Sequence, residues 1–320
     1  MTRAQRRATR RLRSVLTVAS VALVAAGATY YVSSRHSTAL ADATSTTTST
    51  SVPREAREAG WTVVAEGRNG VYSDRKVVVV DGLTFTVARF RQRNVRFNWH
   101  AGSEDPPGFA SRNPEYRNSI NFAGPEGSQG VLGAFNGAFK LDARAGGLKV
   151  ADQVLAPFVL DYATAAIDAN GRLTIFQGPA YAQPPGFNGV VFRQNLPYLV
   201  NQGALTDAVK LRDPGFWGGT IKGGVAQART GLGLDANGNI LYVATMGKCL
   251  PVQLARALLQ AGAHRAMELD INPYWPIMGM ASTPIKSAQG GFAFALPGSE
   301  HAPRVFITGW TRDFFVVTAR

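Results

Sequence analysis

Two acidic residues, Glu268 and Asp270, are the strongest candidates for catalysis in the sequence. They lie in residues 266–272, where apolar and polar residues alternate as in a strand with one buried face. Positions i and i+2 of a strand point the same way, with Cα atoms about 6.6 Å apart, so we expect both carboxylates and Asn272 on one face. Such a pair can cleave a glycosidic bond, because one acid protonates the leaving oxygen while the other assists water or stabilises the oxocarbenium ion. The alternative is a solvated strand face or ordinary ion pairing.

Further side chains are candidate substrate contacts, Asn272 among them. Arg229 lies beside a glycine-bearing turn, where its guanidinium could hold a phosphate through two parallel hydrogen bonds. A structural ion pair with one of the strand carboxylates is the alternative for this residue, and the two roles are compatible. Asn136, just before Gly137, could bind a sugar hydroxyl or adopt a left-handed turn conformation. Lys140 is a candidate phosphate contact.

The elements that must position these residues are predicted in the same region. Asn237-Gly238 lies between apolar runs and predicts a hairpin turn, because both residues tolerate positive φ. A helix is predicted over residues 251–261, with Gly262 as its stop and four residues on its apolar face: Val252, Ala255, Leu258 and Leu259.

Strand-like runs dominate the rest of the chain, and few helical stretches separate them. This pattern favours a β-rich α+β fold with mixed sheets over an alternating βαβ fold. Residues 99–130 and 213–224 are rich in glycine and polar residues and are predicted to be long irregular segments, which are usually functional or disordered. The predicted strands cover residues 61–65, 77–80, 83–90, 131–135, 154–162, 173–176, 189–192, 196–200, 240–244, 292–295, 305–308 and 314–317.

Several of these landmarks together resemble the phosphodiester glycosidase family. The resemblance covers roughly residues 131–275, and the family's glycine run after its Leu-Asp strand is replaced here by residues 271–275. It implies a similar β-rich fold, hydrolysis of a sugar phosphodiester, Asp270 as a catalytic residue, and Thr230 beside Arg229 in substrate binding. The landmarks, in the family's order, are Phe135-Asn136-Gly137-Ala138-Phe139, Leu199-Val200-Asn201-Gln202-Gly203, Arg229-Thr230-Gly231-Leu232-Gly233 and Glu268-Leu269-Asp270.

The N-terminal region is typical of an export segment followed by a linker. Residues 1–14 are basic, residues 15–32 are apolar and residues 33–60 are rich in Ser and Thr, so the folded domain is expected over residues 61–320. An 18-residue helix spans about 27 Å, just enough for a bilayer core of about 30 Å, and its basic flank should stay in the cytoplasm. We expect an uncleaved transmembrane anchor rather than a cleaved signal helix. The domain would then lie in the cell envelope outside the cytoplasm, or be secreted if the segment is cleaved.

Charge and cysteine content narrow the choice of partners and cofactors. Of the formal charge of +13, nine arginines and three acidic residues place +6 in residues 1–60, which leaves +7 for the domain. A basic domain outside the cytoplasm suits an anionic envelope polymer, although general arginine-richness explains the charge equally well. Nucleic acid is not expected, because no recognition helix or aromatic-basic pattern is present. No Cys/His spacing predicts a zinc site, the single Cys249 is interpreted as a buried apolar residue, and no cofactor is identified.

The sequence therefore predicts a membrane-tethered extracytoplasmic hydrolase that cleaves a sugar phosphodiester or related glycosidic linkage in an envelope polysaccharide. Two alternatives stay open. One is a hydrolase or transferase that acts on an ordinary glycosidic bond through Glu268 and Asp270. The other is a non-catalytic module of the same fold that binds an envelope glycan.

Overall fold

Antiparallel sheets joined by short turns make up most of the computed structural model, which describes residues 58–219 and 223–320. The predicted basic segment 1–14, the apolar segment 15–32 and nearly all of the linker 33–60 lie outside the described residues. Within the described ranges, no helix has the length and apolar character needed to cross a membrane.

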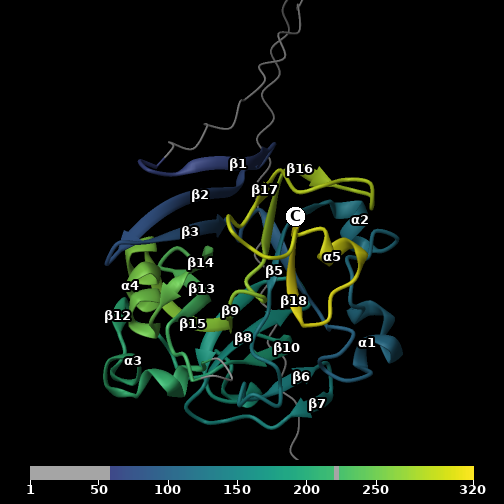
Figure 1. Ribbon diagram of the computed structural model, residues 1–320. Helices are drawn as coiled ribbons and strands as arrows, with labels where there is room; N and C mark the ends of the chain where they lie inside the picture. The colour runs from purple at the N-terminus through teal and green to yellow at the C-terminus, as the bar shows by residue number, and fades with distance from the viewer. Residues whose placement is uncertain (1–57, 220–222) are drawn as a thin grey trace, which may run out of the picture. The chain divides into compact units, whose positions relative to one another are not determined.

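The strands form three sheets (Figure 1), and every strand pair within the described ranges is antiparallel. The expected β-rich fold with few helices is confirmed. The expected mixed sheets are wrong, since hairpin turns join many of the neighbouring strands and hairpins produce antiparallel pairs.

The largest sheet carries the predicted hairpin and the predicted acidic strand. Its eight strands, in spatial order, are β1 (Thr62–Gly67), β2 (Gly70–Val80), β3 (Leu83–Phe90), β14 (Ile240–Cys249), β13 (Gln227–Asp235), β15 (Ala263–Ile271), β11 (Val200–Asn201) and β12 (Ala204–Leu205). Strands β13 and β14 form the hairpin predicted around Asn237-Gly238, which is confirmed.

Two five-stranded sheets complete the architecture. One has the order β7 (Gln153–Ala156), β6 (Leu148–Val150), β10 (Gly189–Gln194), β8 (Ala163–Asp168) and β9 (Leu173–Gln177). The other has the order β17 (Phe294–Ala295), β16 (Met278–Ile285), β5 (Val131–Asn136), β18 (Phe314–Ala319) and β4 (Val95–His100).

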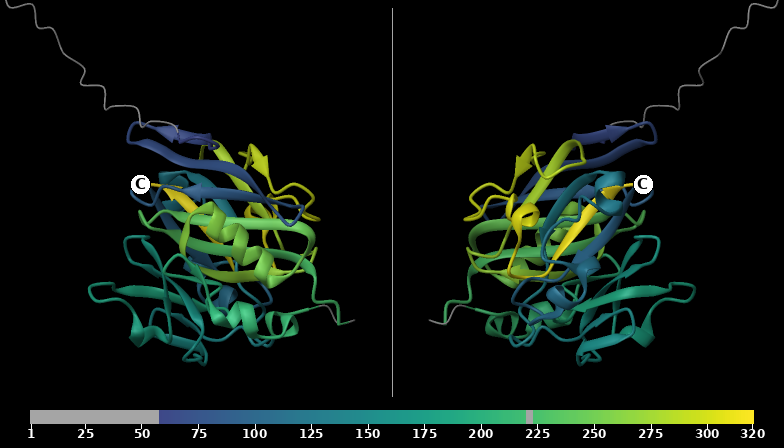
Figure 2. Two further views of the ribbon diagram at one scale, coloured as in Figure 1. Left: turned by 90° about the vertical axis from the view of Figure 1, so that its left-hand side faces the viewer. Right: turned by 90° about the vertical axis from the view of Figure 1, so that its right-hand side faces the viewer.

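The predicted helix after Pro251 is confirmed as α4 (Pro251–Ala261), which covers one face of the eight-stranded sheet (Figure 2). Its Leu254 and Leu258 pack against Leu241 and Val243 of β14 in one buried cluster. Gly262 ends the helix in a left-handed conformation, with φ of 101°. The other helices are α1 (Phe109–Arg112), α2 (Pro125–Gln129), α3 (Asp207–Leu211), α5 (Val305–Thr308) and the 3-10 turns Pro114–Tyr116, Ala180–Ala182 and Pro214–Trp217.

The opposite face of the large sheet meets both smaller sheets in a shared aromatic core. Phe135 of β5 lies at its centre, with ring centroids 6.0 Å from Phe90, 5.0 Å from Tyr242 and 5.3 Å from Phe315. Because Phe135 directly precedes Asn136, this packing fixes the end of β5 where the first predicted site residue lies.

Two predicted strands are wrong, and a third, over residues 154–162, is a strand only as far as Ala156. Residues 305–308 form the helix α5, since a short apolar run between Pro303 and Gly309 fits either element and here buries Phe306 and Ile307 through a helical turn. Residues 196–200 contribute only Val200 to a strand, because Leu196 has a φ of 57° and interrupts the extended backbone.

Candidate functional site

Strand β15, which carries both predicted catalytic residues, contains a register shift against β13. Arg229 of β13 pairs with Ile271, whereas Gly231, two positions further on, pairs with Glu268. Three steps along β15 therefore oppose two steps along β13, which is the pattern of a β-bulge. A bulge reverses the alternation of the side chains that follow it.

The bulge separates the two carboxylates. Leu269 packs in the core shared by the three sheets, but Ile271, two positions along, packs in the cluster beside α4. Glu268 consequently lies on the α4 side of the sheet and Asp270 on the other. The prediction that Glu268, Asp270 and Asn272 share one face is wrong, because the extra residue breaks the two-residue period.

Side chains from neighbouring segments satisfy the backbone of the bulge. Asn195 Nδ2 donates to the carbonyl oxygen of Glu268 at 2.9 Å, and Thr230 Oγ1 donates to that of Asp270 at 2.6 Å. The Asp270 N–H donates to the carbonyl oxygen of Gly137 at 3.0 Å. Buried backbone groups without a ladder partner need such bonds, and here these bonds hold Asp270 in place.

Asn136 belongs to the same support. Its Nδ2 donates to Thr230 Oγ1 and to the Gly137 carbonyl, both at 3.0 Å. Its Oδ1 accepts from the Tyr242 hydroxyl at 2.8 Å and from the Ile277 N–H at 3.3 Å. The residue is buried, and its donors and acceptors are all used within the protein. The structure therefore places Asn136 and Thr230 as supports of Asp270 rather than as groups open to a ligand.

Replacing Thr230 with valine is expected to lower the free energy of unfolding by about 1–3 kcal/mol, because the change strips partners from the Asp270 carbonyl and from Asn136 Nδ2. Urea denaturation measures this loss. Thr230→Ser keeps the hydroxyl and should recover most of the stability, and Thr245→Val on β14 is the matched control. Equal losses in Thr230→Val and Thr245→Val would contradict the supporting role.

Arg229 is enclosed on the α4 side of the sheet with Glu268. Both side chains are fully buried and form an ion pair through Arg229 Nη1 and Glu268 Oε1. Burial raises the pKa of Glu268 to about 7, although Arg229 acts in the opposite direction. The remaining N–H groups of Arg229 donate to the backbone carbonyls of Trp217, Gly218, Val225 and Cys249. The structure thus shows the structural ion pair that was expected as the alternative to phosphate binding. The segment 213–219 contributes two of the carbonyl oxygens that accept from this arginine.

Asp270 meets a second, unpredicted cation. Its Oδ2 lies 3.1 Å from Arg312 Nη2, and its Oδ1 accepts from the Ile271 N–H at 2.9 Å. Burial raises the pKa of Asp270 to about 7, Asp313 raises it further, and Arg312 opposes the shift. A carboxyl group with such a pKa can exchange a proton near neutral pH, which an ordinary surface aspartate does not do.

Arg312 is a buried cation whose hydrogen-bonding capacity is only partly used. Its side chain is 8% exposed, and neither Nε nor Nη2 makes a hydrogen bond with the described residues, since the approach to Asp270 lacks hydrogen-bond geometry. Nε lies 3.9 Å from Asp105 Oδ2, and the guanidinium carbon lies 4.6 Å from the centre of the Trp275 ring. Buried N–H groups without acceptors are costly, so this guanidinium is suited to an added anion.

Asp313 and Arg193 extend the charged cluster. Asp313 Oδ2 accepts from Trp99 Nε1 at 3.0 Å and from Arg193 Nε at 2.8 Å. A Cβ atom on Gly137 would lie 2.6 Å from Asp313 Cγ, so the close approach of these segments requires glycine there. Burial and the neighbouring Asp313 also raise the pKa of Asp105. The acid–base cluster consists of Asp105, Asp270, Asp313, Arg193 and Arg312.

The last two predicted contacts, Lys140 and Asn272, also lie outside this cluster. Lys140 is exposed and pairs with Asp142 at 3.0 Å. Asn272 is half-buried, has a φ of 66° and accepts from the Tyr274 N–H at 3.2 Å in the turn that follows β15. Neither side chain reaches Asp270 through a hydrogen bond or ion pair in the described residues.

The interpretation of Cys249 as a buried apolar residue agrees with the structure. Burial raises the pKa of its thiol to about 12, so the thiol stays protonated at neutral pH. In the part of the chain that the structure describes, no group of three or more His, Cys, Asp or Glu side chains is placed to hold a metal ion.

Sequence reasoning missed Arg312, Asp313, Arg193 and Asp105. The available signals were a charged pair directly before the apolar run 314–317 and an arginine directly after the predicted strand 189–192. A charged residue inside or at the start of a buried strand demands a partner, and this rule would have brought Arg193 and Asp313 into consideration.

Comparisons with known proteins show which family part of the chain is similar to. Residues 131–270 match the family model of the phosphodiester glycosidases. No curated protein sequence matches the chain. Among solved structures, the catalytic domain of zebrafish N-acetylglucosamine-1-phosphodiester alpha-N-acetylglucosaminidase, auto-inhibited by its pro-peptide, aligns with a TM-score of 0.47 and 14% identity over 81% of this chain and 87% of that one.

Two further solved structures align more loosely. A hypothetical protein from Synechocystis has a TM-score of 0.40 and 13% identity, covering 78% of this chain and 62% of that one. A putative exported protein from Burkholderia pseudomallei has a TM-score of 0.31 and 12% identity, covering 80% and 76%. The match over residues 131–270 includes the Asn136, Arg229 and Asp270 segments, and it confirms the resemblance of this part of the chain to the phosphodiester glycosidase family.

Proposed function

We propose that the chain is a hydrolase that cleaves the bond between the anomeric carbon and the phosphate oxygen of a sugar phosphodiester in an extracytoplasmic polysaccharide. The observation that carries the proposal is the buried Asp270–Arg312 pair at the end of the segment that matches the family. The family match supports the reaction class. The basic and apolar N-terminal sequence supports a membrane-tethered location outside the cytoplasm.

In the proposed reaction, Arg312 exchanges its contact with Asp270 for the anionic phosphate. Protonated Asp270 then donates its proton to the departing phosphate oxygen as the C1–O bond breaks. Water adds to C1 and gives a proton back to the Asp270 carboxylate, so the products are a free reducing sugar and a phosphate monoester. Trp275 lies over Arg312, and we propose that its ring is displaced when the substrate enters.

Oxygen labelling tests this bond assignment. The full-length protein would be incubated in H2¹⁸O with the methyl phosphodiesters of glucose-, mannose-, galactose- and N-acetylglucosamine-1-phosphate. Cleavage at C1–O leaves the methyl phosphate product unlabelled, whereas cleavage at P–O places ¹⁸O in a phosphate. The label is read in the phosphate because a reducing sugar exchanges its anomeric oxygen with water. Labelled phosphate, or no turnover of any diester, would overturn the proposal.

The near-complete burial of Asp270 and Arg312 favours one second candidate, a binding module of the same fold without catalysis. The hydrolase or transferase that relies on paired carboxylates loses support, since Glu268 and Asp270 lie on opposite sides of the sheet and have separate arginine partners.

A further inference from the structure

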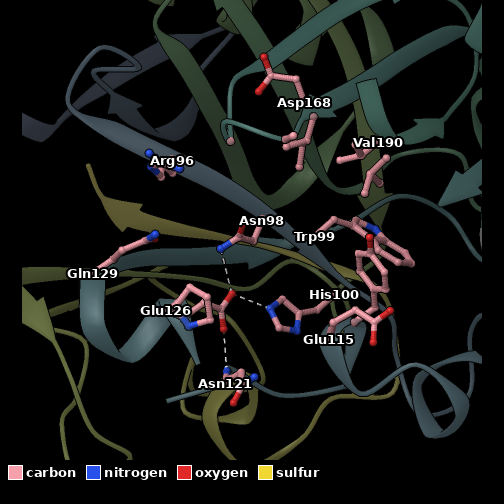
Figure 3. A pocket seen from close by; sticks show the side chains of 16 residues that line it. Arg96, Asn98, Trp99, His100, Glu115, Asn121, Glu126, Gln129, Asp168 and Val190 are labelled. Atoms are coloured by element: carbon pink, nitrogen blue, oxygen red, sulfur yellow. Dashed lines mark hydrogen bonds and ion pairs between the residues drawn. The ribbon is translucent and has the colours of Figure 1, made fainter. Parts of the chain in front are cut away.

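A cavity of about 420 Å³ opens beside β4, at a place that the proposed reaction does not use. Its lining comes from β4, from the segment 115–129, which includes α2, from the end of β8 with the turn that follows it, and from β10 (Figure 3). Volumes of this size are typical of sites for small organic ligands. The long segment 99–130, predicted to be functional or disordered, is thus ordered here and forms one wall.

The base of the cavity is a rigid pair of buried side chains. His100 Nε2 lies 2.7 Å from Glu126 Oε1, and His100 Nδ1 lies 2.6 Å from the carbonyl oxygen of Arg117 (Figure 3). A carbonyl oxygen only accepts, so Nδ1 carries a hydrogen. Glu126 also accepts from Asn98 Nδ2 at 3.2 Å and from the Asn121 N–H at 2.6 Å. Burial alone would raise the pKa of Glu126, yet His100 and these donors hold it below its ordinary value. The side chains of this pair are therefore already bonded within the protein and act as a buried support.

The walls, by contrast, present polar groups that have no partner among the described residues. The Arg96 guanidinium makes no hydrogen bond or ion pair there, and neither does the Tyr116 hydroxyl. The Gln129 Nε2 donates to nothing, although its Oε1 accepts from Thr318. Asp168 uses Oδ1 for the backbone of its own turn and leaves Oδ2 without a partner. Figure 3 shows Arg96, Gln129 and Asp168 around the cavity with the His100–Glu126 pair at its base.

The chemistry of the lining selects a ligand class. Arg96 and Gln129 Nε2 donate, Asp168 accepts, and the Tyr116 hydroxyl does both. Hydroxyl groups also do both, so a ring that bears several of them can satisfy this mixture. The positive charge of Arg96 is offset by Asp168 and the exposed Glu115, which disfavours a polyanion. Apolar side chains complete the lining and suit the face of a sugar ring: Ile167, Val190 and Val191.

We propose that this cavity binds one or two rings of an uncharged saccharide, at a site separate from Asp270. Trp99 joins the two places, since it lines the cavity and its indole N–H donates to Asp313 of the acid–base cluster. The proposal does not depend on the reaction at Asp270. Such a site would hold part of a glycan chain on the domain even if no bond is cleaved.

Binding of four uncharged disaccharides tests the proposal: maltose, mannobiose, lactose and the N-acetylglucosamine dimer. Titration of the full-length protein with each, up to about 10 mM, is followed by calorimetry and by ligand-observed NMR. At least one should bind saturably. Arg96→Gln and Tyr116→Phe should each weaken its binding by about fivefold, the effect of losing one hydrogen bond. Arg172→Gln, an exposed arginine of the neighbouring turn, is the matched control and should change binding by less than about twofold.

Further measurements decide where the disaccharide binds and whether the cavity prefers uncharged sugars. Asp270→Asn should leave disaccharide binding unchanged, which separates this cavity from the proposed active site. Binding that disappears in Asp270→Asn and persists in Arg96→Gln would overturn the proposal, as would failure of all four disaccharides to bind. Tighter binding of digalacturonic acid than of every uncharged disaccharide would overturn the assignment to uncharged sugars.

Discussion

Asp270→Asn is expected to lower kcat by about 10³-fold on any sugar phosphodiester that the wild-type protein cleaves. The asparagine keeps the shape of the side chain but cannot donate a proton to the leaving oxygen, and general acid catalysis contributes about 10²–10⁴-fold. The loss should fall on kcat more than on KM, because proton transfer occurs in the transition state. Steady-state kinetics on the purified variant measures both constants. Asp161→Asn, which alters an exposed ion pair with Arg212, is the matched control.

The pH profile separates chemistry from a loss of structure. Burial raises the pKa of Asp270 to about 7, so the protonated form that donates is lost as the pH rises through 7. Wild-type kcat should therefore fall by about tenfold per pH unit above 7, and the residual activity of Asp270→Asn should not show this fall. An Asp270→Asn protein with full activity, or with the wild-type profile, would show that another group carries the proton.

Arg229→Met is expected to lower the free energy of unfolding by about 3–5 kcal/mol, the usual cost of removing one partner from a buried ion pair. The change leaves Glu268 and four carbonyl oxygens without their donor. Arg229→Lys should also be destabilised, since three ammonium hydrogens on a flexible stem cannot serve the same set of acceptors. Arg212→Met, at an exposed pair, should change the stability by less than about 1 kcal/mol.

A double-mutant cycle tests the origin of that loss. If the loss of stability arises because Glu268 is left buried without its partner, the double variant Glu268→Gln/Arg229→Met should lose clearly less free energy of unfolding than the sum of the single variants. Urea denaturation supplies all four values, and specific activity per folded molecule should stay near that of the wild type. A stably folded Arg229→Lys protein with a strongly raised KM would instead restore Arg229 to the role of phosphate contact.

The secondary-structure elements around the site were predicted better from the sequence than the charged side chains that meet in it. The β13–β14 hairpin and α4 follow from local signals, namely Asn237-Gly238, the apolar face after Pro251 and the stop at Gly262, and all of them are confirmed. The site depends on contacts between distant segments. Asp270 and Arg312 are 42 positions apart in the chain, and no local pattern joins them.

The bulge in β15 explains the main error. Alternation along a strand assumes a constant register, and residues 266–272 have a regular alternating pattern. The extra residue becomes apparent only against β13, where Arg229 and Gly231 define the partner register. The same limit applies to Asn136. Its type and its neighbour Gly137 suggested a sugar contact or a left-handed turn conformation, but the residue is buried beside the aromatic core around Phe135.

Strand β18 lies between β5 and β4 in its sheet, although it begins 178 positions after the end of β5 and 214 positions after the end of β4. During synthesis, β4 and β5 would therefore keep open edges until residues 314–319 leave the ribosome, and exposed strand edges invite pairing with other chains. Arg312 and Asp313 arrive in the same stretch. A nascent chain that has not yet inserted β18 thus lacks both the strand that joins β5 to β4 and the cation that faces Asp270, so an incomplete domain has no assembled acid–base cluster.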